Sequence, residues 1–283
     1  MVKLPAAGTI FLMLLSTLTR PGAGAAQGAG SEPAPAPGAT AGETAAEVLS
    51  GSALSLDFGV VRHGQSDRSA SALRYSGTAP VIGLGYERVR SRSRLELGAS
   101  FAMGTLTSTI TEANVPREDA WLGRLGLRYL RRVATAAGHR MTLLAGGQID
   151  AHALFRIHHY IEQGTEDYAD LLVPLQLAAG WEWAFGGAAA GTRIGQRLAL
   201  PVLGLVMRTP YGGLKYVPPL ELAPPGEILG LDQELFVERT GSRRVGIRVA
   251  WLFRVLQHPE PHQLRLVTHR VMLGGLLRLG GGG

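Results

Sequence analysis

Apolar and polar residues alternate along short stretches of this chain. Successive side chains of an extended strand point to opposite faces. The stretch 121–130 has one face with Trp121, Leu125, Leu127 and Tyr129 and another with Arg124, Gly126 and Arg128. The same alternation predicts strands near 53–62, 79–90, 93–106, 119–132, 139–153, 170–184, 191–206, 228–239, 243–255 and 263–279. None of these stretches has the period of a long amphipathic helix, so the fold class is all-β.

Long and short connections alternate between these predicted strands. Four are short, at 91–92, 133–138, 185–190 and 240–242, and four are long, at 63–78, 107–118, 154–169 and 207–227. In bacterial outer-membrane barrels short turns face the periplasm and long loops face outside. The rhythm predicts an antiparallel transmembrane β-barrel of about 10 strands (range about 8–12). The last hairpin, around 258–262, is shorter than this pattern expects.

The two faces of the strands differ in chemistry. One is glycine-rich and charged, and the other is apolar, as at Ile82, Leu84, Leu97, Phe101, Leu175 and Leu177. A narrow lumen has little room for side chains, so the glycines favour an apolar exterior in contact with lipid. Aromatic residues are expected at both membrane interfaces. The strand directions place them at an outer rim (Trp121, Trp251, Phe253) and at a periplasmic rim (Tyr86, Tyr129, Trp183, Phe185).

The N-terminal region has the layout of an exported protein. Lys3 precedes an apolar run over 6–18, and small residues follow up to Ala26, which predicts a cleavable signal peptide over 1–26. An uncleaved anchor is the alternative. Residues 27–50 are rich in Ala, Gly and Pro and read as a disordered linker. The barrel then occupies 51–283, and the sequence contains no cysteine to form a disulfide.

The net charge of +6 raises the question of anionic partners. The arginines are dispersed along strands and turns, which favours solvated or lumen-lining roles over nucleic-acid binding. The expected partners are outer-membrane lipid, lipopolysaccharide and the outer-membrane assembly machinery, and the oligomeric state is left open. No nucleotide fingerprint, phosphate-binding loop or zinc-finger spacing occurs, so no cofactor and no metal site are expected.

Polar side chains on the inward face form the main candidate site. We expect them to line the lumen either as a rigid ion-pair network or as a narrow water-filled pore in which excess arginine favours anions. They are Glu96, Arg124, Arg128, Gln148, Asp150, Gln176, Glu182, Arg197, Arg244 and Arg248.

Two weaker patterns suggest hydrolysis. His63 and Ser66 invite comparison with outer-membrane lipases and lipid A deacylases, although a spacing of three puts the two side chains on opposite faces of a strand. Asp150 and His152 are expected to gather near one mouth, where such groups hold zinc or activate water, as in outer-membrane proteases. Further members of that group are His158, His159, Glu162, Glu166 and Asp167.

Proline marks an irregularity in the strand predicted over 191–206. Pro201 removes a hydrogen-bond donor and is expected at an edge or a bulge, where it breaks the strand before the loop 207–227. That loop is expected either to constrict the mouth or to lie outside.

Over residues 52–280 the pattern resembles bacterial outer-membrane β-barrel proteins in general. The C-terminus departs from them, because four glycines follow Leu279 where such barrels often end in an aromatic residue. The resemblance implies an outer-membrane location. The first hypothesis is a non-enzymatic, porin-like or structural barrel of a Gram-negative cell envelope. One alternative is an outer-membrane hydrolase of lipid or peptide. The other is a secreted soluble barrel that binds an apolar ligand, in which the apolar face of every strand would point inward.

Overall fold

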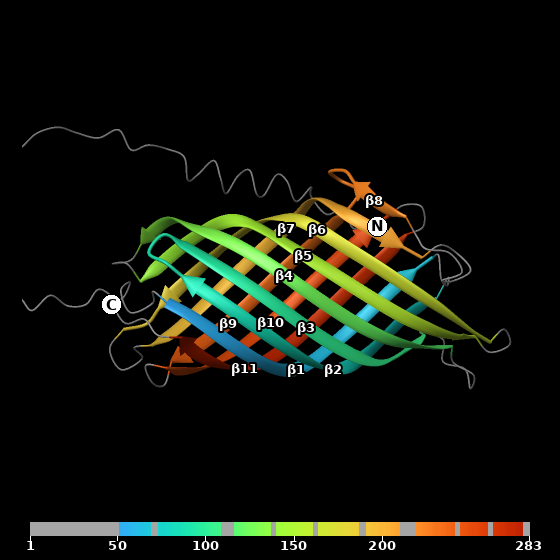
Figure 1. Ribbon diagram of the computed structural model, residues 1–283, viewed down its shortest axis with the longest axis horizontal. Coiled ribbons are helices and arrows are strands. Elements are labelled where there is room, and N and C mark those ends of the chain that lie inside the picture. Colours follow the sequence, from blue (N-terminus) through green and yellow to red (C-terminus); the bar gives the residue numbers. More distant parts are fainter. Residues whose placement is uncertain are drawn as a thin grey trace, which may run out of the picture. The chain divides into compact units, whose positions relative to one another are not determined.

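One antiparallel sheet closes on itself to form a barrel (Figure 1). The computed structural model describes residues 51–68, 73–108, 116–136, 140–160, 164–186, 191–209, 219–240, 244–259 and 263–279. The predicted signal peptide and linker lie outside these residues. No helix in the described part of the chain is long and apolar enough to span a membrane.

The strands follow the predicted order. They are β1 (Gly51–Asp67), β2 (Arg74–Val89), β3 (Ser93–Ser108), β4 (Arg117–Ala136), β5 (Met141–Tyr160), β6 (Gly164–Ala184), β7 (Thr192–Arg208), β8 (Leu220–Ala223), β9 (Leu229–Thr240), β10 (Val245–His258) and β11 (Leu264–Leu279). All except β8 close a ring of 10 strands, in which β11 pairs with β1. The predicted fold class is therefore confirmed, and only β8, which pairs with residues 204–207 of β7, was not predicted.

Two of the predicted long loops are largely strand. β1 continues to Asp67 and β2 begins at Arg74, while β5 continues to Tyr160 and β6 begins at Gly164. The loop predictions at 63–78 and 154–169 were therefore wrong at their edges. Many inward-facing residues in these extensions, such as His63, Gln65 and Arg156, are polar yet buried, so the apolar alternation on which the prediction depended is interrupted there.

Pro201 does not end its strand. β7 runs without a break from Thr192 to Arg208. Its register with β6 shifts by one residue, because Gln176 faces Pro201 while Leu175 faces Leu203. On its other side β7 pairs with β9 up to Ala199 and with β8 from Gly204. Pro201 thus lies at a bulge between two partner strands, where its missing N–H is tolerated.

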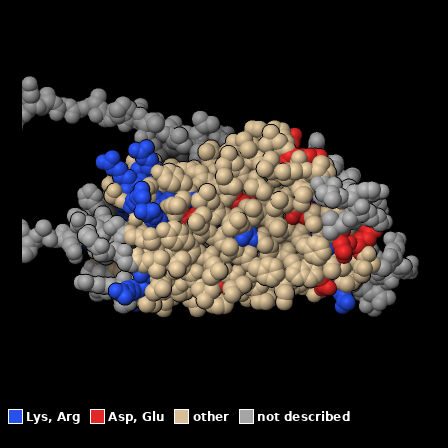
Figure 2. All heavy atoms as spheres, viewed as in Figure 1, with Lys and Arg blue, Asp and Glu red and all other residues tan. Residues whose placement is uncertain are grey.

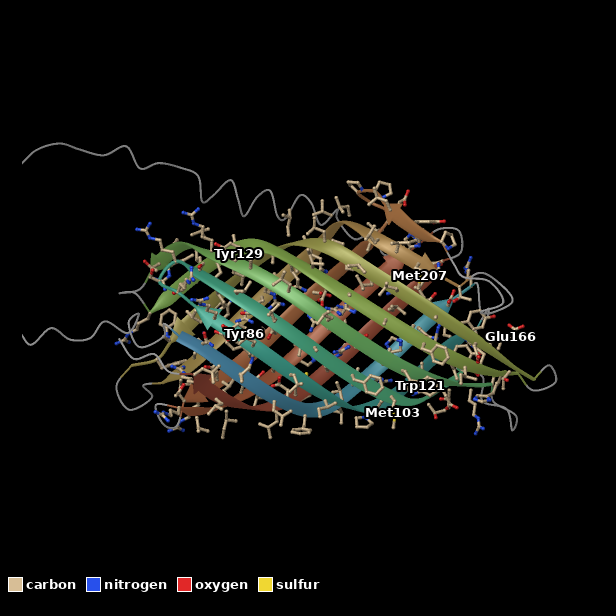
Figure 3. All side chains as sticks on the ribbon, viewed as in Figure 1. Tyr86, Met103, Trp121, Tyr129, Glu166 and Met207 are labelled. Carbon is tan, nitrogen blue, oxygen red and sulfur yellow. The ribbon has the colours of Figure 1, made fainter. Side chains whose placement is uncertain are left out.

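The outer wall of the barrel is apolar. Charged side chains gather at the two ends in Figure 2, and the surface between them is almost free of them. Leu125, midway between Trp121 and Tyr129 on β4, is 64% exposed. Tyr86 and Tyr129 lie toward one end of the barrel and Trp121 toward the other (Figure 3). Ladder pairing around the ring satisfies the backbone, so this wall is built to contact lipid.

The face assignment excludes one alternative. A soluble barrel that binds an apolar ligand needs its leucines and tryptophans inside, whereas Leu84, Phe101 and Leu177 are exposed on the outer wall. The hypothesis of a secreted soluble barrel is therefore wrong.

Beyond the rim marked by Trp121 the strands continue with polar outer faces. Thr105, Thr107 and Arg117 are exposed there, and Asp119 accepts a hydrogen bond from Thr105 (2.8 Å). The loop end of the barrel therefore projects past the apolar wall. The side chains inside this extension lie outside the membrane-spanning segments.

Candidate functional site: the barrel lumen

The inner part of the lumen, toward the short turns, holds a dense ion-pair network. Arg128 Nη1 lies 3.0 Å from Glu96 and 2.8 Å from Glu234, and Arg193 Nη2 lies 2.5 Å from Glu238. The network contains six arginines and five glutamates: Arg94, Arg128, Arg193, Arg197, Arg248 and Arg278 with Glu87, Glu96, Glu182, Glu234 and Glu238. Such pairing is the condition under which charges are tolerated inside a membrane protein.

An inward-facing aromatic ring anchors this network. Arg197 lies 4.6 Å and Arg248 lies 4.9 Å from the centroid of Phe236 on β9. Guanidinium groups at this distance from a ring face are attracted by its quadrupole. Phe236 therefore holds the arginines in place from the side that the glutamates leave open.

A second charged layer crosses the middle of the lumen. Asp150 is fully buried and accepts hydrogen bonds from Arg124 (2.8 and 2.7 Å) and Arg254 (2.7 Å). Arg254 also donates to Asp232 (2.6 Å) and to Nδ1 of His152 (2.8 Å). A guanidinium group only donates, so His152 Nδ1 accepts and the imidazole is neutral with its proton on Nε2.

Apolar side chains close the lumen between this layer and the loop end. Leu106, Leu154, Leu172, Leu256 and Leu264 project inward from five strands, and each is at most 3% exposed. Tyr75, Ala120, Val206, Ala223, Ile228 and Leu266 complete this apolar layer. A smaller cluster around Val61 and Met272 lines the wall of β1, β2, β3 and β11. Side chains from eight of the 10 strands of the ring therefore meet in the apolar layer.

A third charged cluster, the mouth cluster, lies beyond the apolar layer, in the extension past the outer rim. Arg156 is fully buried and contacts both Asp67 (2.7 Å) and Asp170. Asp67 also accepts from Arg208 (2.6 Å). Glu118 accepts from Gln65 (2.5 Å) and lies 3.4 Å from His158.

Burial shifts the protonation of two groups in this cluster. It raises the pKa of Glu118 to about 7, and the neighbouring carboxylates of Asp67 and Asp170 act in the same direction. Burial lowers the pKa of His158 to about 4, and the positive charge of Arg156 adds to that shift. The pair therefore favours a protonated carboxyl group beside a neutral imidazole at weakly acidic pH.

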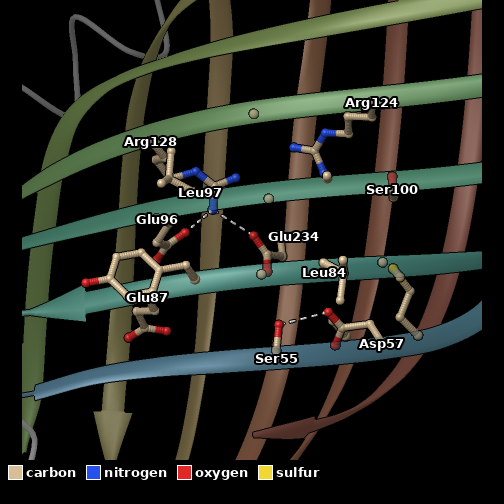
Figure 4. Close-up of a pocket in the computed structure, with 18 of the residues that line it drawn as sticks. Ser55, Asp57, Leu84, Glu87, Glu96, Leu97, Ser100, Arg124, Arg128 and Glu234 are labelled. Atoms are coloured by element: carbon tan, nitrogen blue, oxygen red, sulfur yellow. Dashed lines mark hydrogen bonds and ion pairs between the residues drawn. The ribbon is translucent and has the colours of Figure 1, made fainter. Parts of the chain in front are cut away.

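A chamber of about 140 Å³ lies on the β1–β4 side of the lumen (Figure 4). Its space depends on inward-facing glycines. A Cβ on Gly126 would lie 2.7 Å from Asp150 Oδ1, and one on Gly85 would lie 2.4 Å from Ser55 Oγ. Arg124, Arg128, Arg248 and Arg270 line the chamber together with Asp57, Glu96 and Glu234.

Nearly all residues predicted to line the lumen face inward. Glu96, Arg128, Glu182, Arg197 and Arg248 lie in the inner network, and Arg124, Gln148, Asp150 and Gln176 lie in or beside the middle layer. Arg244 is the exception, because its side chain is exposed in the turn before β10. The strand begins at Val245, two residues later than predicted, and this leaves Arg244 outside it, so its assignment to the lumen was wrong.

Several lumen residues were not among those predicted. Arg254 and Arg270 share the alternation of their strands with residues that face inward, and so do Asp232 and Glu234 on β9. The alternation itself was the signal that would have identified them. In the mouth cluster, His158 was a predicted candidate, whereas Asp67, Glu118, Arg156 and Arg208 were missed because their segments were assigned to loops.

The candidate hydrolytic residues do not form a common site. His63 faces inward and bonds to Thr268 and Gln65, both at 3.2 Å, whereas Ser66 lies on the opposite face of β1. Asp150 and His152 lie in the middle layer, below the apolar layer that separates them from His158. The remaining candidates are dispersed: His159 pairs with Asp119 on the outer face, Glu166 accepts from Tyr168, and Glu162 lies outside the described residues.

Among the described residues, no group of three or more His, Cys, Asp and Glu has the geometry to hold a metal ion.

Comparisons with known proteins give similarity to outer-membrane barrels. No family model and no curated protein matches the sequence. Among solved structures, the outer-membrane protease OmpT from Escherichia coli aligns with 81% of this chain and 97% of its own, at 9% identity and a TM-score of 0.49. Neisserial surface protein A aligns with 80% of this chain and 99% of its own, at 10% identity and a TM-score of 0.36. The transport unit of the autotransporter AIDA-I from Escherichia coli covers 81% of this chain and 90% of its own, at 7% identity and a TM-score of 0.41. At these values the similarity carries no argument about function.

Proposed function

We propose that this chain is an integral protein of the bacterial outer membrane, with a closed lumen, that acts as a structural membrane barrel. The apolar outer wall between two aromatic rims supports the membrane location. The observation that carries the structural role is the apolar layer, in which buried leucines from five strands meet across the lumen. An apolar layer of this kind opposes the passage of water and ions.

The charge balance of the lumen favours a structural network over an anion-selective pore. A pore that selects anions needs an excess of positive charge along its path. In the inner network each arginine has a carboxylate partner, which neutralises most of the positive charge. The sequence-based expectation of an arginine excess depended on the residues that alternation first suggested, and Asp232, Glu234 and Glu238 were not among them.

Two measurements test this proposal. Expression of the full chain in a Gram-negative host, followed by gel electrophoresis of outer membranes with and without boiling, tests location and closure. A band in the outer membrane that shifts on boiling is expected. Planar-bilayer recording of the purified barrel then tests the lumen, and no steady conductance is expected. Ion-selective steps that persist in several preparations would establish a pore and refute the structural role.

The hydrolase alternative has less support. The described residues bring no nucleophile within hydrogen-bond reach of a base, since His63 and Ser66 occupy opposite faces of β1. Assays of the purified barrel with phospholipid, lipopolysaccharide and peptide substrates test it directly. Turnover that disappears in the Ser66→Ala variant would revive the alternative.

A further inference from the structure

One buried arginine of the lumen lacks a carboxylate partner. Arg270, on β11, is 7% exposed, and its guanidinium donates to Ser100 Oγ at 2.6 Å. In the described part of the chain, no carboxylate oxygen lies within 4.0 Å of it. Every arginine of the inner network, by contrast, contacts at least one glutamate.

The charged groups of the middle layer do not supply the missing negative charge. Arg124 and Arg254 share Asp150, and Arg254 also pairs with Asp232, so the middle layer has one more arginine than carboxylates. His152 is neutral and adds no charge. An uncompensated charge inside a membrane protein is costly, and a counter-ion or water relieves that cost.

Arg270 faces open space rather than packed side chains. It lines the chamber of about 140 Å³ and also a smaller cavity of about 20 Å³. Ser100 and Arg124 belong to the same wall of the chamber (Figure 4). A cavity of about 150 Å³ is known to accept a molecule of benzene's size, so the chamber has room for a ligand of about six non-hydrogen atoms.

We propose that this chamber binds a small monovalent anion on the guanidinium of Arg270, with Ser100 fixing the orientation of that group. Asp57, Glu96 and Glu234 line the same chamber and disfavour a second negative charge on the ligand. The ligand class is therefore a small monocarboxylate or a halide, and not a dicarboxylate. This inference adds a binding site to the barrel and does not depend on the closed lumen or on the outer-membrane location.

Thermal unfolding of the purified full-length barrel in detergent, followed by loss of the heat-modifiable band, tests the site. Sodium acetate and sodium chloride are titrated separately into sodium gluconate at constant ionic strength, because gluconate exceeds the size of the chamber. At an anion concentration about five times Kd, the Tm is expected to rise by about 2–4 °C. Comparison of the Tm rise in acetate with that in chloride shows whether the site prefers a carboxylate or a halide. Succinate is expected to produce no rise in Tm.

Three variants assign the effect to the chamber. Arg270→Gln removes the charge and should abolish the rise. Gly98→Leu keeps Arg270 but fills the chamber, since a Cβ on Gly98 meets only Leu84 O, at 4.0 Å, and it should abolish the rise as well. Arg193→Gln is the matched control, because Arg193 pairs with Glu238 in the inner network and does not line the chamber, and it should keep the response.

The outcomes separate clearly. A rise in the wild type that disappears in the Gly98→Leu variant supports the site even where Arg270→Gln fails to fold. No anion-specific rise in the wild type, or an equal rise in the folded Arg270→Gln or Gly98→Leu variant, overturns the proposal. Neither result bears on the bilayer recordings that test the closed lumen.

Discussion

Replacement of Asp150 by asparagine should destabilise the barrel more than any change at a surface ion pair. Asp150 is fully buried and accepts from Arg124, Arg254 and Gln148, the last at 2.6 Å. Asparagine has nearly the same shape, so packing is preserved while the negative charge is lost. Arg124 then keeps no carboxylate partner among the described residues, whereas Arg254 keeps Asp232.

The expected cost follows from the number of buried charges that lose compensation. Removing one partner of a buried ion pair typically costs about 3–5 kcal/mol. Arg124 lines the neighbouring chamber, which is large enough to admit water, so we expect the lower half of this range, about 3–4 kcal/mol. Asp119→Asn is the control, because its pair with His159 lies at the surface and such pairs contribute about 0–1 kcal/mol.

Equilibrium unfolding of the detergent-solubilised barrel in guanidinium chloride, followed by tryptophan fluorescence, measures both changes. The double variant Asp150→Asn with Arg124→Leu should recover part of the loss, because it also removes the uncompensated charge. If Asp150→Asn unfolds within about 0.5 kcal/mol of the wild type, the middle layer does not stabilise the fold and the structural interpretation of the lumen charges is refuted.

Three further predictions test the wall, the mouth cluster and the hydrolytic candidates. Leu125→Arg places a charge midway between the two rims and should cost about 2–4 kcal/mol by the same unfolding assay; a neutral result would show that this face does not contact lipid. Because the folded pKa of Glu118 is raised to about 7, this group lowers stability progressively as pH rises from its unfolded pKa to about 7. The stability gained in Glu118→Gln should therefore grow over that range and level off above it, and a gain independent of pH would contradict the assignment. Ser66→Ala should leave stability within about 0.5 kcal/mol of the wild type, whereas His63→Ala, which removes a buried group bonded to Thr268 and Gln65, should cost about 1–3 kcal/mol; equal effects of the two changes would contradict their placement on opposite faces.

The sequence by itself determined the architecture, because the features that define a membrane barrel are local. Side chains alternate with a period of two, so Leu125 and Arg124 were assigned to opposite faces without knowledge of any partner strand. Short turns such as 90–92 fix which strands are neighbours, and the 10 strands of the ring were found in order. The same local rule placed nine of the predicted polar residues on the inward face and failed only at Arg244, where the turn continues past the expected strand start.

Tertiary structure alone decided what the lumen contains. Arg156 and Asp67 are 89 residues apart and Arg208 and Asp67 are 141 apart, and only closure of the ring brings them together. The tilt and stagger of the strands set the depth of each inward residue, and alternation carries no information about depth. For this reason three features could be found only in the folded structure. They are the apolar layer, the mouth cluster, and the charge of Arg270 beside a glycine-lined chamber. Polarity along a strand is a local property, whereas compensation of a buried charge depends on every strand that faces it.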